Sequence, residues 1–203
     1  MMQTFEKQIV SRIYGTGRGW SFFQGDFGDL AGRPTTDWNL FQLAESGTIR
    51  RVFRGIYDYP RYSELLQTQL SPDIESVAQA LARKFGWRIQ PNGEMALNLI
   101  GLSTQVPARA LYLSDGPTRS YTIGKTTLAF RHTKLKEARF KHRESGLIVQ
   151  ALRALGQERI DAAVIAKIRA WLPEQMRAKV RKDTQRATAW VHEVIMKITE
   201  PDE

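Results

Sequence analysis

Cysteine is absent from the 203 residues, and only three histidines are present. The lack of cysteine excludes disulfides and thiolate metal sites and is typical of a reducing cytoplasm, and three histidines are too few to indicate a metal cluster. No segment reaches the roughly 20 apolar residues of a membrane-spanning helix. The N-terminus MMQTFEKQIV lacks the apolar core of a signal peptide. These absences predict a cytoplasmic protein with no metal, cofactor or membrane partner.

Catalytic patterns are also missing. Gly124-Lys125-Thr126 resembles the end of a phosphate-binding P-loop, but that motif needs a glycine where Arg119 stands. The glycine cluster at 15–19 follows a helical pattern rather than a strand, which is the wrong context for a dinucleotide loop. No acid pair or Ser-His-Asp set has a convincing context. We therefore expect no enzymatic activity, and an enzyme acting on nucleic acid is kept as a rival hypothesis.

Positive charge is in excess, with a net charge of +9 and a pI near 10.0. Such a protein is a candidate for binding nucleic acid, an acidic protein surface or an anionic membrane. Residues 1–60 carry seven Lys and Arg against six Asp and Glu, whereas residues from 131 onward carry 16 against 10. The basic run 131–143 is a solvated linker, an additional DNA contact or a seat for an acidic partner.

Residues 1–60 show the sharpest succession of elements. Apolar spacing and turn residues predict helices over 4–14, 25–31 and 35–45, a short strand over 20–23, and two strands over 48–52 and 56–59. Gly47 ends the third helix, and residues 53–55 join the last two strands. This order predicts a winged helix-turn-helix, a fold that places one helix in a DNA groove.

Ten residues of this module are predicted to contact DNA. Asn and Gln side chains suit adenine, a helix N-terminus suits phosphate, and a wing arginine can enter the minor groove or bind the backbone. Strand alternation places one of Arg50 and Arg51 toward solvent and the other nearer the sheet base. The alternative is a solvated helix face, with Trp38 covered by the C-terminal part of the chain and with edge arginines that prevent wrong strand pairing. The predicted set is Arg18, Arg33, Thr35, Thr36, Trp38, Asn39, Gln42, Arg50, Arg51 and Arg54.

Residues 61–203 are predicted as a second domain in two parts. The α/β part, 61–133, has helices over 74–85 and 92–102, a strand over 87–90, and a small antiparallel sheet from strands over 110–114, 119–123 and 126–132. The helical part, 134–203, has helices over 147–155, 161–172 and 174–199. The predicted fold class is α+β: an N-terminal winged helix-turn-helix over 1–60, a central small antiparallel sheet with helices, and a C-terminal helical tail.

The string GRGWSFFQGDFGDLAGRPTTDWNLFQLAESGTIRRVFRGIYDYP resembles the N-terminal winged helix of AbiEi-type antitoxins of type IV toxin–antitoxin systems. Its ending, residues 55–60, is similar to a sub-group with a Gly-aromatic-Tyr-Pro wing, and ALNLIGLSTQVP at 96–107 looks like that group's central segment. The resemblance implies an antitoxin that represses its own operon at promoter inverted repeats. It also implies neutralisation of a nucleotidyltransferase-like toxin encoded beside it. Asn39 and Gln42 stand where relatives tend to have a small and a basic residue.

Two further expectations concern assembly and the rival function. A single winged helix buries limited surface, so specific binding predicts two copies on a palindromic site of double-stranded DNA. Such a protein would be associated with the nucleoid. The alternative is a stand-alone winged-helix transcription regulator whose second domain senses a ligand or a partner.

Overall fold

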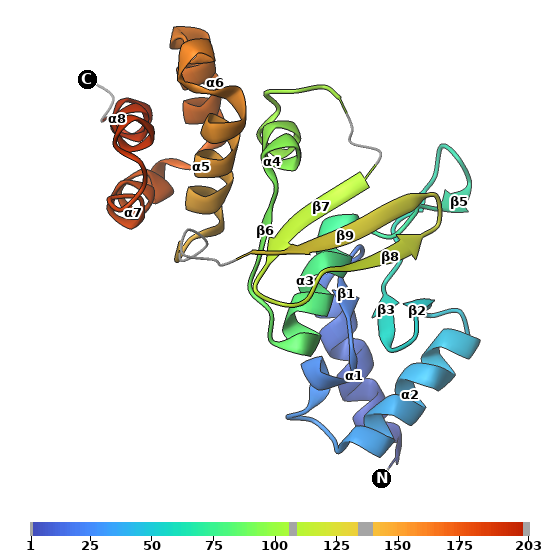
Figure 1. Cartoon of the computed structure of the whole chain (residues 1–203). Coiled ribbons are helices and arrows are strands. Elements are labelled where there is room, and N and C mark those ends of the chain that lie inside the picture. Colours follow the sequence, from blue (N-terminus) through green and yellow to red (C-terminus); the bar gives the residue numbers. More distant parts are fainter. Residues whose placement is uncertain (1, 106–108, 134–139, 201–203) are drawn as a thin grey trace. The chain divides into compact units, whose positions relative to one another are not determined.

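The computed structural model describes residues 2–105, 109–133 and 140–200, in which helices alternate with small antiparallel sheets (Figure 1). This confirms the predicted α+β class. Two compact units are present: a first unit of residues 1–87 with 121–128, and a second unit of residues 88–120 with 129–203. No helix within the described ranges is long and apolar enough to cross a membrane. Parts of the predicted 96–107 segment and of the basic run 131–143 lie outside the described residues.

The first unit begins with α1 (Met2–Thr16), β1 (Ser21–Phe22), the 3-10 helix η1 (Gln24–Phe27) and α2 (Arg33–Glu45). It continues with β2 (Arg50–Phe53) and β3 (Ile56–Asp58), and β3 is the central strand of an antiparallel sheet in the order β1-β3-β2. The predicted elements are therefore confirmed, except that the helix expected over 25–31 is the shorter η1. Large side chains of the core have no exposed surface, among them Ile9, Ile13, Phe22, Phe27 and Leu40.

The helix α3 (Ile74–Phe85) also belongs to the first unit. The Asp73 carboxylate accepts a hydrogen bond from the Ser76 N–H at 3.1 Å, and Gly86 ends the helix with a φ of 68°. The apolar stripe of α3 is buried, and the helix packs against β1 and β3. The functional boundary predicted after residue 60 stays a prediction, but the compact unit extends to residue 87 because α3 belongs to it.

A small hairpin that the sequence pattern does not indicate precedes α3. It consists of β4 (Tyr62–Ser63) and β5 (Thr68–Gln69), each only two residues long. Its turn contains no glycine, and Gln67 takes the left-handed conformation at a φ of 49°. Short strands without the usual turn residues give no period-two signal, which explains why the hairpin was missed.

The second unit starts with β6 (Ile89–Pro91) and α4 (Gly93–Ile100), followed by β7 (Arg109–Ser114). The next strands along the chain are β8 (Arg119–Ile123) and β9 (Thr126–His132), whose residues 121–128 are assigned to the first unit, and the sheet order is β6-β7-β9-β8. The three predicted strands are confirmed. Gly124-Lys125 lies in the hairpin turn rather than in a strand-to-helix loop, so the P-loop geometry is absent there.

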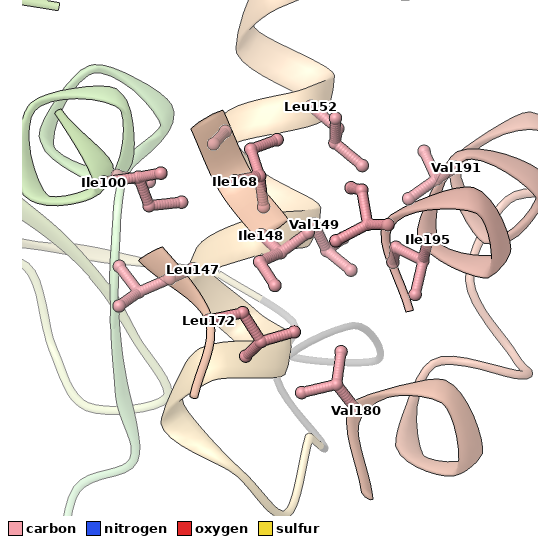
Figure 2. Close-up of a cluster of buried hydrophobic side chains, with 13 residues drawn as sticks. Ile100, Leu147, Ile148, Val149, Leu152, Ile168, Leu172, Val180, Val191 and Ile195 are labelled. Carbon is pink, nitrogen blue, oxygen red and sulfur yellow. The ribbon is translucent and has the colours of Figure 1, made fainter. Parts of the chain in front are cut away.

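Four helices and a short 3-10 helix form the rest of the second unit: α5 (Arg143–Leu155), η2 (Gln157–Arg159), α6 (Ala162–Trp171), α7 (Glu174–Asp183) and α8 (Ala189–Ile198). Buried side chains from α4 to α8 form one cluster, in which Ile148, Ile168 and Ile195 are fully buried (Figure 2). The single helix predicted over 174–199 is wrong. The helix is interrupted at residues 184–188, where the Thr184 Oγ1 donates a hydrogen bond to the Val180 carbonyl at 2.9 Å. The helices α7 and α8 each contribute buried side chains to the same cluster.

Gly93, at the start of α4, lies too close to α5 for a side chain. A Cβ there would be 2.5 Å from the Ala154 Cβ and 3.2 Å from the Gln150 carbonyl oxygen. We expect Gly93→Ala to lower the free energy of unfolding by about 1–3 kcal/mol in urea denaturation, because the two helices must move apart. Adding Ala154→Gly should restore part of the loss beyond simple additivity. Wild-type stability of Gly93→Ala would contradict this close approach.

Candidate nucleic-acid interface

The outer face of α2 is aromatic and polar. The helix has Pro34 in its first turn, where a missing N–H breaks no helical bond, and Gly47 follows its end with a φ of 74°. Leu40 is fully buried on the inner side, whereas Trp38 and Phe41 are each 47% exposed. Residues three apart are neighbours on a helix, so these rings form an exposed pair, with Gln42 and Asp37 also exposed on this helix.

Two predicted contacts on α2 are corrected because their side chains are buried. Asn39 is 3% exposed, and its Nδ2 donates to the Thr35 carbonyl at 2.8 Å. Thr36 is 1% exposed, and its Oγ1 donates to the Gly32 carbonyl at 3.2 Å. Thr36 and Asn39 lie on the same helical stripe as Leu40, so neither side chain can reach a base edge in this conformation. Thr35 is half-buried, and Gln42 is the predicted amide that stays exposed.

Arg50 is held within the sheet. It lies opposite Asp58 in the β2–β3 register, and its Nε and Nη2 donate to the two carboxylate oxygens at 3.0 and 2.6 Å. Asp58 is 1% exposed, and the Arg50 Nη1 also donates to the Leu70 carbonyl at 2.9 Å. These bonds form a bidentate ion pair. Arg50 therefore has a structural role in the sheet, and its contact with phosphate stays a prediction.

Arg51 and Arg54 present their side chains to solvent. Arg51 lies opposite Tyr57 in the register, and Arg54 and Gly55 form the β2–β3 turn, with Gly55 at a φ of 75°. Within the described ranges neither guanidinium has a hydrogen bond or an ion pair. The predicted alternation is thus confirmed, with Arg51 toward solvent and Arg50 inside. Both free charges are available to an anion.

Lys84 reaches this turn from the last turn of α3. Its Nζ donates to the carbonyls of Gly55 at 3.2 Å and of Arg54 at 3.4 Å. Burial lowers the pKa of Lys84, and the positive charges of Arg33 and Arg54 lower it further, against the opposing effect of Asp37. Sequence reasoning missed Lys84, because a lysine in the last turn of a helix is already explained by the helix dipole.

These interactions place four cations around one surface of the first unit. Arg33, the first residue of α2, is exposed and pairs weakly with Asp37, whose Oδ2 lies 3.6 Å from the Arg33 Nε. The charge of Asp37 acts on both Lys84 and Tyr57, and that of Arg51 also acts on Tyr57. The N-terminus of α2, the β2–β3 turn and the end of α3 are therefore neighbours. We call Arg33, Arg51, Arg54 and Lys84 the basic surface.

Arg18 lies elsewhere on the unit and joins the end of α1 to the end of β3. Its guanidinium carbon lies 4.6 Å from the centre of the Tyr59 ring, and its Nη1 donates to the Pro60 carbonyl at 2.8 Å. Stacking on an aromatic ring and a backbone hydrogen bond give Arg18 a structural role. Its contact with DNA stays a prediction.

The part of the chain that the structure describes contains no group of three or more His, Asp and Glu residues that could hold a metal ion. A search of curated proteins finds no match to the chain. A family model described as a family of unknown function matches residues 8–180, a range that includes α2, β2, β3 and α3. The chain therefore belongs to the DUF6088 family.

Proposed function

We propose that the first unit is a winged helix-turn-helix that binds double-stranded DNA, with α2 as the recognition helix and the β2–β3 hairpin as the wing. The element order α1-β1-η1-α2-β2-β3 and the sheet order β1-β3-β2 support this proposal. The observation that carries it is the basic surface: Arg51 and Arg54 lack a partner within the described residues, and Arg33 and Lys84 lie beside the same turn and helix.

The proposed docking follows from which side chains are exposed. The B-DNA major groove is about 12 Å wide and admits an α-helix, so α2 would present Trp38, Phe41 and Gln42 to base edges and thymine methyl groups. Arg33 at the helix start would contact phosphate, and Arg54 in the turn would contact the backbone or the minor groove. Asn39 takes no part, because its amide is buried and bonded to Thr35.

The antitoxin role rests on the resemblance of residues 17–60 and 96–107 to AbiEi-type antitoxins. We propose that the protein represses its own operon by binding promoter inverted repeats as two copies, and that it neutralises a nucleotidyltransferase-like toxin. In this proposal the first unit selects the DNA. The remaining chain, with its α/β and helical parts, serves neutralisation.

The proposal is tested by a footprint of the full-length protein on the DNA upstream of its own gene. We expect two protected half-sites related by an inverted repeat, with centres one helical turn or a multiple of a turn apart. Equal binding to upstream and random DNA at every salt concentration would contradict operator recognition. Growth arrested by the neighbouring nucleotidyltransferase-like gene should be rescued by this chain, and failure of rescue would leave DNA binding as its only supported role.

A second candidate is a stand-alone regulator whose second part senses a ligand. A cavity of about 680 Å³ in the second unit favours it, because small-molecule sites commonly have volumes of roughly 300–1,000 Å³. A genetic experiment distinguishes the two functions. The antitoxin requires a toxin whose activity it suppresses, whereas the regulator controls its promoter with no toxin gene nearby.

A further inference from the structure

The cavity of the second unit lies where the start of α5 meets the end of α7. Four of the residues that line it are the cations Lys141, Lys179, Lys182 and Arg186. Among the described lining residues Asp183 is the carboxylate, and Gln185 adds a neutral amide. The described lining thus has four cations against one carboxylate, a strong excess of positive charge.

Two of these cations lie on α7. Lys179 and Lys182 are three residues apart, a spacing that places their side chains on one side of the helix, and Arg186 lies in the turn between α7 and α8. Val180 is fully buried in the cluster of the second unit, so α7 is anchored by its opposite face (Figure 2). Arg181 is directed away from the cavity group, since its Nε donates to the Thr199 Oγ1 at 3.1 Å.

The Asp183 carboxylate is held by the backbone rather than by one of the lysines. Its two carboxylate oxygens accept hydrogen bonds from the backbone N–H groups of Lys141 and His142, each at 3.0 Å. Burial is the largest single effect and opposes ionisation, but these two bonds together with the effects of other neighbouring groups hold the pKa of Asp183 below its ordinary value. Within the described ranges the side chains of Lys141, Lys179, Lys182 and Arg186 have no ion pair. The N–H groups of these lysine and arginine side chains are therefore available to bind a ligand.

We propose that this cavity binds a polyphosphate group, either inorganic tripolyphosphate or the triphosphate of a nucleotide. Ammonium and guanidinium groups form charge-assisted hydrogen bonds with phosphate oxygens, and four such groups converge here. His142 is the aromatic residue among those that line the cavity, so a nucleobase finds little stacking surface. The recognised part is therefore the phosphate chain.

The test is isothermal titration of the full chain with tripolyphosphate in 0.15 M NaCl. We expect saturable binding that the double variant Lys179→Gln/Lys182→Gln weakens at least tenfold. The charge-matched control is Lys167→Gln/Lys197→Gln, which removes two exposed lysines outside the cavity and should leave binding within about twofold. Thermal melts confirm that each variant is folded. Equal weakening by both double variants, or no binding at millimolar tripolyphosphate, would overturn the proposal.

Asp183→Asn separates a binding site from a merely structural cluster. It removes the negative charge from the cavity, so tripolyphosphate should bind several-fold more tightly. The protein is less stable, because the amide offers one oxygen where two accept from the Lys141 and His142 N–H groups. Unchanged or weaker binding in folded Asp183→Asn protein would contradict the site. ATP is titrated in parallel. An affinity for ATP equal to that for tripolyphosphate shows that only the phosphate chain is recognised, and a higher affinity for ATP shows that the ligand is a nucleotide. Both outcomes support the proposal.

The competing ligand is the backbone of a single nucleic-acid strand. An oligonucleotide whose binding depends on Lys179 and Lys182 and exceeds that of tripolyphosphate a hundredfold would replace the polyphosphate proposal. The inference is independent of the winged helix. Arg51→Gln/Arg54→Gln should leave the cavity affinity unchanged, and the Lys179→Gln/Lys182→Gln protein should keep the footprint register. Failure of one proposal can therefore be told from failure of the other.

Discussion

Arg50→Met should lower the free energy of unfolding by about 3 kcal/mol, because it leaves the Asp58 carboxylate buried without a counter-charge. The Asp58 carboxylate is 1% exposed in the central strand β3, and its two oxygens accept from Arg50 at 2.6 and 3.0 Å. The variant also loses the bond to the Leu70 carbonyl, which fixes the chain before α3. Urea denaturation followed by circular dichroism measures the loss.

Two matched variants show whether this loss comes from the ion pair. Arg51→Met makes the same change on the next residue, whose side chain is exposed and unpaired within the described ranges, and should shift stability by less than about 0.5 kcal/mol. Arg50→Met/Asp58→Leu replaces the whole pair with apolar side chains and should recover much of the stability. If Arg50→Met and Arg51→Met have equal effects, the Arg50–Asp58 pair contributes little.

The roles of Arg50 and Arg51 could not be separated from sequence, because a β-bulge sets the register. With residues 53 and 56 paired at the turn, regular pairing would put Arg51 opposite Asp58. The register shifts between Arg51 and Phe53, which puts Arg51 opposite Tyr57 and Arg50 opposite Asp58. One extra residue thus exchanges the buried and the free arginine. Strand alternation predicts that one of the two arginines is buried and the other exposed. The bulge determines that Arg50 is the buried one.

Helices and strands bounded by clear capping or turn residues were predicted well, whereas features that depend on tertiary contacts were not. The helix α3 was predicted because a regular apolar stripe follows Ser71-Pro72-Asp73 and ends at Gly86, and the structure adds that Asp73 caps it. Asn39 was misplaced because its polarity suggests exposure, while its position shares the buried stripe of α2 and its amide is satisfied by a backbone carbonyl. Lys84 contacts a turn about 30 residues earlier in the chain, a pairing that no local pattern encodes.

Arg51→Gln/Arg54→Gln should weaken binding to upstream and random DNA alike, roughly tenfold at 0.15 M NaCl, because both guanidinium groups are free to neutralise phosphates. Each phosphate contact releases about 0.9 counterion equivalents, so the slope of log Kd against log salt should fall by nearly two. A fluorescence-anisotropy titration at several salt concentrations measures both quantities. The exposed lysines Lys7 and Lys125 provide the charge-matched control, since Lys7→Gln/Lys125→Gln removes two charges that are not part of the basic surface.

Comparing Arg51→Gln/Arg54→Gln with Gln42→Ala distinguishes contacts to the DNA backbone from contacts that read a base. Gln42 is exposed on α2, and loss of an amide that reads a base should cost about 1–3 kcal/mol on the operator and much less on random DNA. The arginine variant should instead lose affinity without losing discrimination, because phosphates carry no sequence information. If the arginine variant matches the lysine control in both affinity and salt slope, the β2–β3 turn does not contact the DNA backbone. In that case α2 alone would have to explain any footprint.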